Sequence, residues 1–135
     1  MTNTLDPLAA QKADHFTRSG EEVYAGKHLI IDIQNGHHLD DPITIEQALR
    51  DATRATGATL LHLHTHRFSP QGVTGMAILA ESHIACHTWP EIGYAAFDIF
   101  MCGDTNPHAA IPILKAAFET QDITVQELHR GHLSP

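Results

Sequence analysis

Residues 58–103 have the sequence ATLLHLHTHRFSPQGVTGMAILAESHIACHTWPEIGYAAFDIFMCG, and this stretch decides the fold. It holds three runs of strand length, 58–68, 73–82 and 92–103, in which apolar residues alternate with polar ones or follow one another directly. The turn-forming residues SPQG at 69–72 separate the first two runs. The middle of the chain is therefore expected to form neighbouring strands joined by hairpin-like connections.

Two further strands and two helices are expected on either side of this stretch. The runs KHLIIDI at 27–33 and ITVQEL at 123–128 are typical of strands. A helix is expected between Asp41 and Gly57, because an aspartate cap followed by proline starts it and a glycine ends it. Asn106 and the proline after it repeat the cap signal before a second amphipathic segment, although a further proline weakens its first turn. The element order is therefore β-α-β-β-β-α-β.

This order predicts an α+β fold, a two-layer sandwich in which a mixed or antiparallel sheet carries both helices on one face. The strands hold too many apolar residues for the other face to meet water, so we expect a second copy to pack there, sheet to sheet, in a homodimer. Residues 26–135 are expected to form this domain. Residues 1–25 are polar and mixed and form an N-terminal arm, in which a short helix near Pro7–Thr17 and a mobile segment are both open.

Composition limits the classes of function. The chain has 135 residues, enough for one domain, and a net charge of −8, which argues against a nucleic-acid surface. No apolar run is long enough to span a membrane, and the first thirty residues lack the pattern of a secretory signal. Two cysteines do not make a disulfide framework. These features together predict a cytoplasmic protein.

The densest polar segment is ESHIACHTWPE at 81–91, between two apolar strands. Polar groups placed inside a core are unfavourable unless they are paired, so a site is expected here, with a loop of incidental histidines as the alternative. Serine hydrolase chemistry lacks its signal, because no G-x-S-x-G motif surrounds Ser82. A thiol enzyme that uses Cys86 or Cys102 with a histidine stays open.

Metal binding is a third hypothesis. His62, His64 and His66 alternate, so on a strand they lie on one face at about 7 Å spacing, and such a row can hold zinc with His83 or His87. A row of histidines in a dimer interface or facing solvent is the interpretation that the pattern favours. A zinc-binding protein remains an alternative function from a different class.

Three motifs at matching spacing resemble those of a known family. FSPQGVTG (68–75), ESHIACHTWPE (81–91) and GYAAFDIFMCGD (93–104) resemble the signature of prokaryotic S-adenosylmethionine decarboxylase, a small pyruvoyl-dependent enzyme of polyamine (spermidine) synthesis. GKHLIIDI at 26–33 and ITVQELHRG at 123–131 extend the resemblance over most of the chain. It implies a lyase that generates its own cofactor and takes S-adenosylmethionine as substrate.

The resemblance implies a specific self-cleavage. Ser82 attacks the carbonyl of Glu81 to give an ester, and β-elimination then releases residues 1–81 as the β chain. Residues 82–135 remain as the α chain, with a pyruvoyl group at position 82 that forms a Schiff base with the substrate. A decarboxylase needs such an electron sink, because no ordinary side chain accepts the electron pair well.

Further roles follow from the same resemblance. His87 matches the base that removes the serine α-hydrogen, and Thr74 stands where the family usually has a serine hydroxyl that assists processing. Cys102 matches the proton donor of the decarboxylation. Cys86 matches no family role and is expected in the core. The two cysteines are therefore expected to differ in environment and in function.

Substrate contacts are also implied. Phe68 matches the aromatic residue that stacks on adenine, and Glu91 matches the carboxylate that holds the ribose hydroxyls. Asp32 stands where the family usually has glutamate, and His62 and His64 stand where apolar or hydroxyl residues are more typical. Relatives with this fold decarboxylate arginine or ornithine, and these departures leave a pyruvoyl-dependent decarboxylase of those substrates as the alternative.

Overall fold

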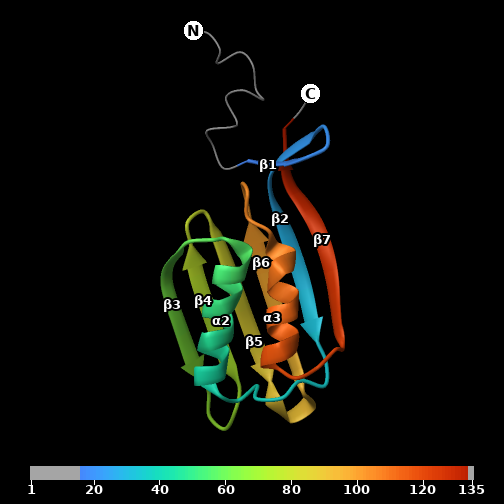
Figure 1. Ribbon diagram of the computed structural model, residues 1–135. Helices are drawn as coiled ribbons and strands as arrows, with labels where there is room; N and C mark the ends of the chain where they lie inside the picture. Colours follow the sequence, from blue (N-terminus) through green and yellow to red (C-terminus); the bar gives the residue numbers. More distant parts are fainter. Residues whose placement is uncertain (1–15, 134–135) are drawn as a thin grey trace.

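The computed structural model describes residues 16–133, which form one antiparallel sheet with two helices on one face (Figure 1). The strands are β1 (Thr17–Ser19), β2 (Glu22–Ile33), β3 (Leu60–Arg67), β4 (Val73–Leu79), β5 (Ser82–Trp89), β6 (Tyr94–Met101) and β7 (Ile123–His132). The helices are α2 (Pro42–Thr56) and α3 (Ala110–Ala117), with the short 3₁₀ turns η2 (Pro90–Ile92) and η3 (Pro107–Ala109). The predicted two-layer α+β arrangement is confirmed.

The sheet runs in the order β7-β2-β6-β5-β4-β3, and β1 pairs with the first residues of β2. Strands β3 to β6 follow one another as a meander, and β2 lies between β6 and the C-terminal β7. β2 begins at Glu22, five residues before the expected start at Lys27, so the sheet includes part of the segment expected as an arm. Of the helix considered near Pro7–Thr17, residues 7–15 lie outside the described range, and Thr17 belongs to β1.

Strand β5 corrects the sequence-based assignment. The sequence predicts one strand over 73–82 and none over 83–91, whereas β4 ends at Leu79 and a two-residue turn leads directly into β5. Tight hairpin turns usually show glycine or asparagine, but this one consists of Ala80 and Glu81, so the sequence carries no turn signal there. The polar segment at 81–91 is therefore mostly a central strand.

The helix signals are confirmed by the caps. The Asp41 carboxylate accepts a hydrogen bond from the Ile43 amide at 3.0 Å, and Gly57 ends α2 with a left-handed φ of 83°. The Asn106 side chain caps the amide of His108 at 3.2 Å, but a 3₁₀ turn precedes the α-helical part. Both helices pack apolar side chains on the core between helix and sheet, which contains Ile31, Ile45, Leu49, Ile84, Phe97, Ile99, Leu114 and Phe118.

The opposite face of the sheet is partly apolar. Side chains that alternate with the core residues point to this open face, and the large apolar ones that stay exposed are Ile30, Met76, Ile78, Trp89 and Leu128. Neither α2 nor α3 covers it (Figure 1). Within residues 16–133, no helix has the length and apolar character needed to cross a bilayer.

Candidate active site

The first group of site residues lies where the β4–β5 turn meets the end of β6. Glu81, Ser82 and Cys102 form it, and we call it the Ser82 group. The Cys102 thiol donates a hydrogen bond to the Glu81 carbonyl oxygen at 3.3 Å, and its sulfur lies 3.8 Å from the Ser82 hydroxyl. The structure thus brings together the serine, the carbonyl before it and the thiol that the sequence singled out.

Two physical features mark this group. Glu81 has a φ of 59°, in the left-handed region that a residue with a side chain adopts only at a cost of about 1–2 kcal/mol. Burial raises the pKa of the Cys102 thiol; the Ser82 hydrogen bond opposes this rise and the charge of Glu81 adds to it. The thiol is therefore protonated at neutral pH, as both a hydrogen-bond donor and a proton donor must be.

The second group lines a pocket of about 360 Å³ at the far end of β5, which we call the His87 pocket. Its lining residues are Phe68, Gln71, Gly72, Val73, Thr74, His87, Thr88, Trp89 and Glu91. The Thr74 hydroxyl and His87 Nδ1 lie 2.9 Å apart, in hydrogen-bond contact across the β4–β5 pair. The four predicted residues Phe68, Thr74, His87 and Glu91 therefore share one cavity.

Residues that the sequence analysis did not single out hold the walls of this pocket. The Thr88 hydroxyl accepts from the Val73 amide at 2.8 Å and donates to the Leu39 carbonyl at 2.7 Å. One Asp40 oxygen accepts from the Gly72 amide at 2.8 Å, and the other pairs with Arg67 at 2.7 Å. The Gly72 hydrogen bond, with Arg67 next, holds the pKa of Asp40 below its usual value. Asp40 thus ties the β3–β4 connection to the loop before α2.

The two groups do not meet within one chain. Ser82 and His87 are five residues apart on β5, a separation of about 16 Å along a strand. The assigned role of processing base requires His87 to reach the Ser82 α-hydrogen. Within one copy, His87 does not lie within that reach. Glu81, Ser82 and Cys102 are at one end of the strand, and the His87 pocket is at the other.

Asp32 lies on the open face, in the same cross-strand row as His87. It pairs with Ala96, which pairs with His87, so two strand spacings of about 10 Å in total separate the two residues. The Tyr94 hydroxyl donates to Asp32 at 2.5 Å, and this bond is the main cause of the raised pKa of Tyr94. Asp32 is thus positioned beside the His87 pocket without lining it.

The structure places the remaining predicted residues, the β3 histidines and Cys86, in different environments. His62, His64 and His66 lie along β3 opposite Ile78, Met76 and Thr74. Among the described residues, the groups that bring three ligand atoms within 4.8 Å of one another are Glu22 with His129 and His132, and His28 with His83 and Asp98; the β3 row is not among them. Cys86 is fully buried, and burial raises the pKa of its thiol to about 12, as expected for a core residue.

Comparisons with known proteins agree on one family. The family model described as S-adenosylmethionine decarboxylase matches residues 27–131. A protein of Methanococcus aeolicus named S-adenosylmethionine decarboxylase proenzyme is 49% identical over 113 residues, which cover 82% of this chain and 97% of the relative. A protein of the same name from Thermomicrobium roseum is 47% identical over 108 residues, which cover 78% of this chain and 93% of the relative.

A solved structure shares the fold. The crystal structure of the adenosylmethionine decarboxylase from Aquifex aeolicus matches with a TM-score of 0.74 and 29% identity. The match covers 82% of this chain and 94% of the solved chain. Family model, sequence relatives and solved structure thus coincide over the region that holds the Ser82 group and the His87 pocket.

Proposed function

The chain belongs to the S-adenosylmethionine decarboxylase family, and from this premise we propose that it cleaves itself before Ser82 and uses the resulting pyruvoyl group to decarboxylate S-adenosylmethionine. The activity of the chain is that of an S-adenosylmethionine decarboxylase, which fits the polyamine pathway. The names of the relatives favour this substrate over arginine and ornithine. The cytoplasm stays the predicted location.

The observation that carries the proposal is the geometry of the Ser82 group. The Ser82 oxygen attacks the Glu81 carbonyl carbon, the peptide C–N bond breaks, and the nitrogen takes up a proton, which leaves an ester. The Cys102 thiol that donates to this carbonyl at 3.3 Å stabilises the negative charge that develops on its oxygen. The left-handed φ of Glu81 raises the free energy of the intact bond and favours its cleavage.

Ester cleavage then needs a base. Removal of the Ser82 α-hydrogen expels the Glu81 carboxylate, and the dehydroalanine left behind takes up water and releases ammonia to give the ketone. We assign the base to His87, whose imidazole the Thr74 hydroxyl orients at 2.9 Å. Within one copy, the backbone positions of Ser82 and His87 are about 16 Å apart along β5, so we assign the base to a second copy.

The open face explains how two copies meet. A two-fold axis between facing sheets, perpendicular to the strands, reverses the strand direction and places the Ser82 group of one copy over the His87 pocket of the other. The exposed Ile30, Met76, Ile78 and Trp89 side chains supply apolar area for such contact. We therefore propose a homodimer with two identical sites, each built from both copies.

Substrate binding divides between the same groups. Once formed, the pyruvoyl group supplies the electron sink for decarboxylation. Cys102 lies beside position 82 and returns the proton to the substrate α-carbon. Phe68 is half exposed at the mouth of the His87 pocket and stacks on the adenine, and Glu91 accepts hydrogen bonds from the ribose. Asp32 lies near enough to this pocket to add negative charge for the sulfonium.

Two measurements test the proposal. Intact mass under denaturing conditions should show chains of 1–81 and 82–135, the latter with a pyruvoyl start, and one uncleaved chain in Ser82→Ala. Coexpression of Ser82→Ala with His87→Ala tests the shared site, because each mixed dimer contains one site with both native groups. Cleavage and decarboxylation should return in the mixture, whereas sites contained within single copies would leave it inactive.

A further inference from the structure

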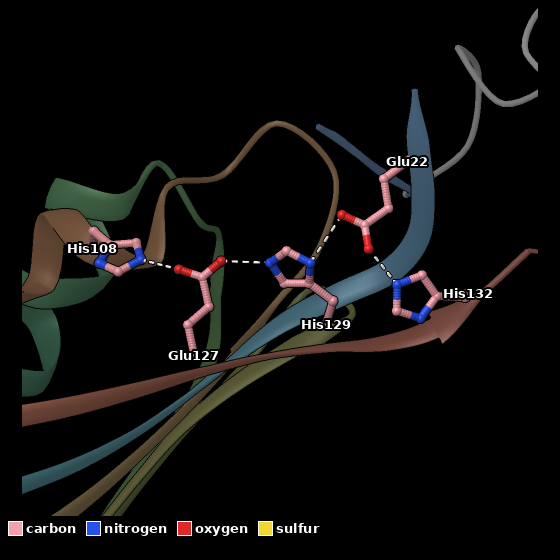
Figure 2. Close-up of polar contacts among 5 residues, drawn as sticks. All are labelled: Glu22, His108, Glu127, His129 and His132. Carbon is pink, nitrogen blue, oxygen red and sulfur yellow. Dashed lines mark hydrogen bonds and ion pairs between the residues drawn. The ribbon is translucent and has the colours of Figure 1, made fainter. Parts of the chain in front are cut away.

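A chain of alternating histidines and carboxylates joins the start of β2 to the end of β7 (Figure 2). One Glu22 oxygen lies 3.1 Å from His129 Nδ1, and the other contacts His132 Nε2. On its far side, His129 Nε2 contacts Glu127 at 2.5 Å, and the second Glu127 oxygen lies 2.5 Å from His108. The proposed decarboxylase mechanism uses none of these five residues.

Local structure brings the three central residues together. His129 and His132 are three positions apart, so on a regular strand they would point to opposite faces. Gly131 lies between them with a φ of 74°, and a Cβ there would come within 2.7 Å of Ala25 Cβ. This glycine interrupts the alternation, and both rings reach Glu22. Tyr24, fully buried, stacks on the His129 ring at 4.3 Å and 8° and fixes its plane.

The spacing of the ligand atoms fits a small divalent metal ion. One oxygen of Glu22 and one nitrogen each of His129 and His132 lie within 4.8 Å of one another. Ligands about 2.0–2.1 Å from a tetrahedral zinc are about 3.3 Å apart, close to the 3.1 Å between Glu22 and His129 Nδ1. Because every pair lies within 4.8 Å, the ligand atoms would have to approach one another by at most about 1.5 Å to coordinate the ion. Two imidazoles and one carboxylate leave the fourth position to water.

Glu127 supplies an independent observation. Metal-binding histidines usually donate their other ring N–H to a carboxylate, which fixes the tautomer. Glu127 accepts in this way from His129 Nε2, and in the metal-free chain the protonated ring also donates from Nδ1 to Glu22; a bound metal would replace that Nδ1 proton while the bond to Glu127 stays. His108 in turn holds Glu127, and these two histidine contacts keep the pKa of Glu127 below its usual value. The ligand His129, its carboxylate partner Glu127 and the His108 side chain that holds Glu127 are thus already in contact.

We propose that Glu22, His129 and His132 bind one divalent transition-metal ion, for which zinc is the best match, and that Glu127 orients His129 as a positioning residue. The other three-ligand group, His28 with His83 and Asp98, lies on the open face and includes the neighbour of Ser82, so it is not separable from the active site.

The site has a consequence that rests on the proposed self-cleavage. Glu22 belongs to the 1–81 chain, whereas His129 and His132 belong to the 82–135 chain. Bound zinc would therefore join the two products through side chains after the peptide bond between them is gone. It would also hold β7 against β2, the strand beside β6, which ends one residue before Cys102.

Zinc titration of the mature protein, stripped with EDTA and dialysed, tests the site by calorimetry and by metal analysis after gel filtration. We expect one zinc per 82–135 chain, and its loss in Glu22→Gln and in His132→Gln, which change different strands. Glu127→Gln should weaken affinity about 10–100-fold. The matched control His64→Gln removes an exposed histidine of the β3 row and should bind like the parent.

The outcomes are distinct. Absence of retained zinc in the parent would overturn the proposal. So would zinc binding as tight as the parent's in both Glu22→Gln and His132→Gln, or loss of zinc in His64→Gln. Circular dichroism of the zinc-free variants checks that each is folded. Uncleaved Ser82→Ala should bind zinc with unchanged stoichiometry. Because cleavage is read separately by mass, a parent that stays in one piece would refute the self-cleavage while the zinc titration still decides the metal site.

Discussion

Replacing Glu81 with glycine should slow self-cleavage although it removes nothing that reacts. Glu81 holds a φ of 59°, which costs a residue with a side chain about 1–2 kcal/mol and glycine almost nothing. If the intact bond loses about 1 kcal/mol of strain that the transition state does not share, the barrier rises by that amount. Cleavage should then slow about fivefold. The backbone carbonyl that accepts from Cys102 is retained in the variant.

The free energy of unfolding of a precursor that cannot be cleaved provides a second measurement of the same strain. In a Ser82→Ala background, Glu81→Gly gains about 1–2 kcal/mol of relieved strain and loses about 0.5–1 kcal/mol through the greater freedom of unfolded glycine. The free energy of unfolding should therefore rise by up to about 1.5 kcal/mol, and by about 0.7 kcal/mol at the midpoints of these two ranges. Urea unfolding followed by circular dichroism measures this difference.

The cleavage assay follows fresh precursor from cell-free translation, quenched in detergent and resolved on gels. Glu81→Gln serves as the matched control, because it removes the carboxylate near Cys102 but keeps a side chain in the left-handed conformation. We expect the glutamine variant to cleave near the parent rate and the glycine variant about fivefold more slowly. A glycine variant that is more stable yet cleaves as fast as the parent would show that the strain is not released in the transition state.

Three further predictions follow. Cys102→Ala should be cleaved more slowly, because the Glu81 carbonyl loses its donor, and the matured protein should lose about 10²–10⁴-fold in kcat, measured by carbon dioxide release; full activity would refute the acid assignment. Phe68→Ala should raise KM about tenfold with cleavage unchanged, as lost stacking predicts. In zinc-free protein, the contact with Glu127 is the main cause that raises the pKa of His129 above 6.5, so this stabilisation is present below pH 6.5 and fades as pH rises through the raised value. At the acid end this stabilisation is lost when Glu127 takes up a proton, and because its pKa is lowered this happens below pH 4.5. The difference in melting temperature between the parent and Glu127→Gln should therefore be larger at pH 5.5 than at pH 8.5.

The elements that the sequence predicts are those with local signals. Helix α2 follows from Asp41 and Gly57 because capping depends on neighbours within one turn. Strand β5 is missed because its turn at 80–81 has no residue that prefers a left-handed φ, and Glu81 adopts one nonetheless. The rule that turn residues favour a left-handed φ thus fails at the peptide bond proposed to break, where the strain would favour cleavage.

The site residues show a similar division. Resemblance identifies Ser82, His87 and Cys102 but says nothing of their distances, and only the assignment of β5 as a continuous strand separates the first two. Asp40 and Thr88 act through hydrogen bonds to backbone groups 32 and 49 residues away, for which spacing carries no signal. The contact between Glu22 and His132 joins positions 110 residues apart, so only the register of β2 and β7 reveals it.

The separation of the Ser82 group from the His87 pocket gives the open face a reason to stay apolar. In the proposed mechanism, a single copy holds the strained bond and the thiol at one end of β5 and the base at the other, so it would form the ester but lack the base for elimination. Ester formation is reversible, whereas elimination is not. A chain that meets no second copy would then return to the intact peptide, and the irreversible step would wait for assembly. Exposed Ile30, Met76 and Ile78, unfavourable in a lone copy, would drive that assembly. On this view the same surface drives pairing and sets when the cofactor forms.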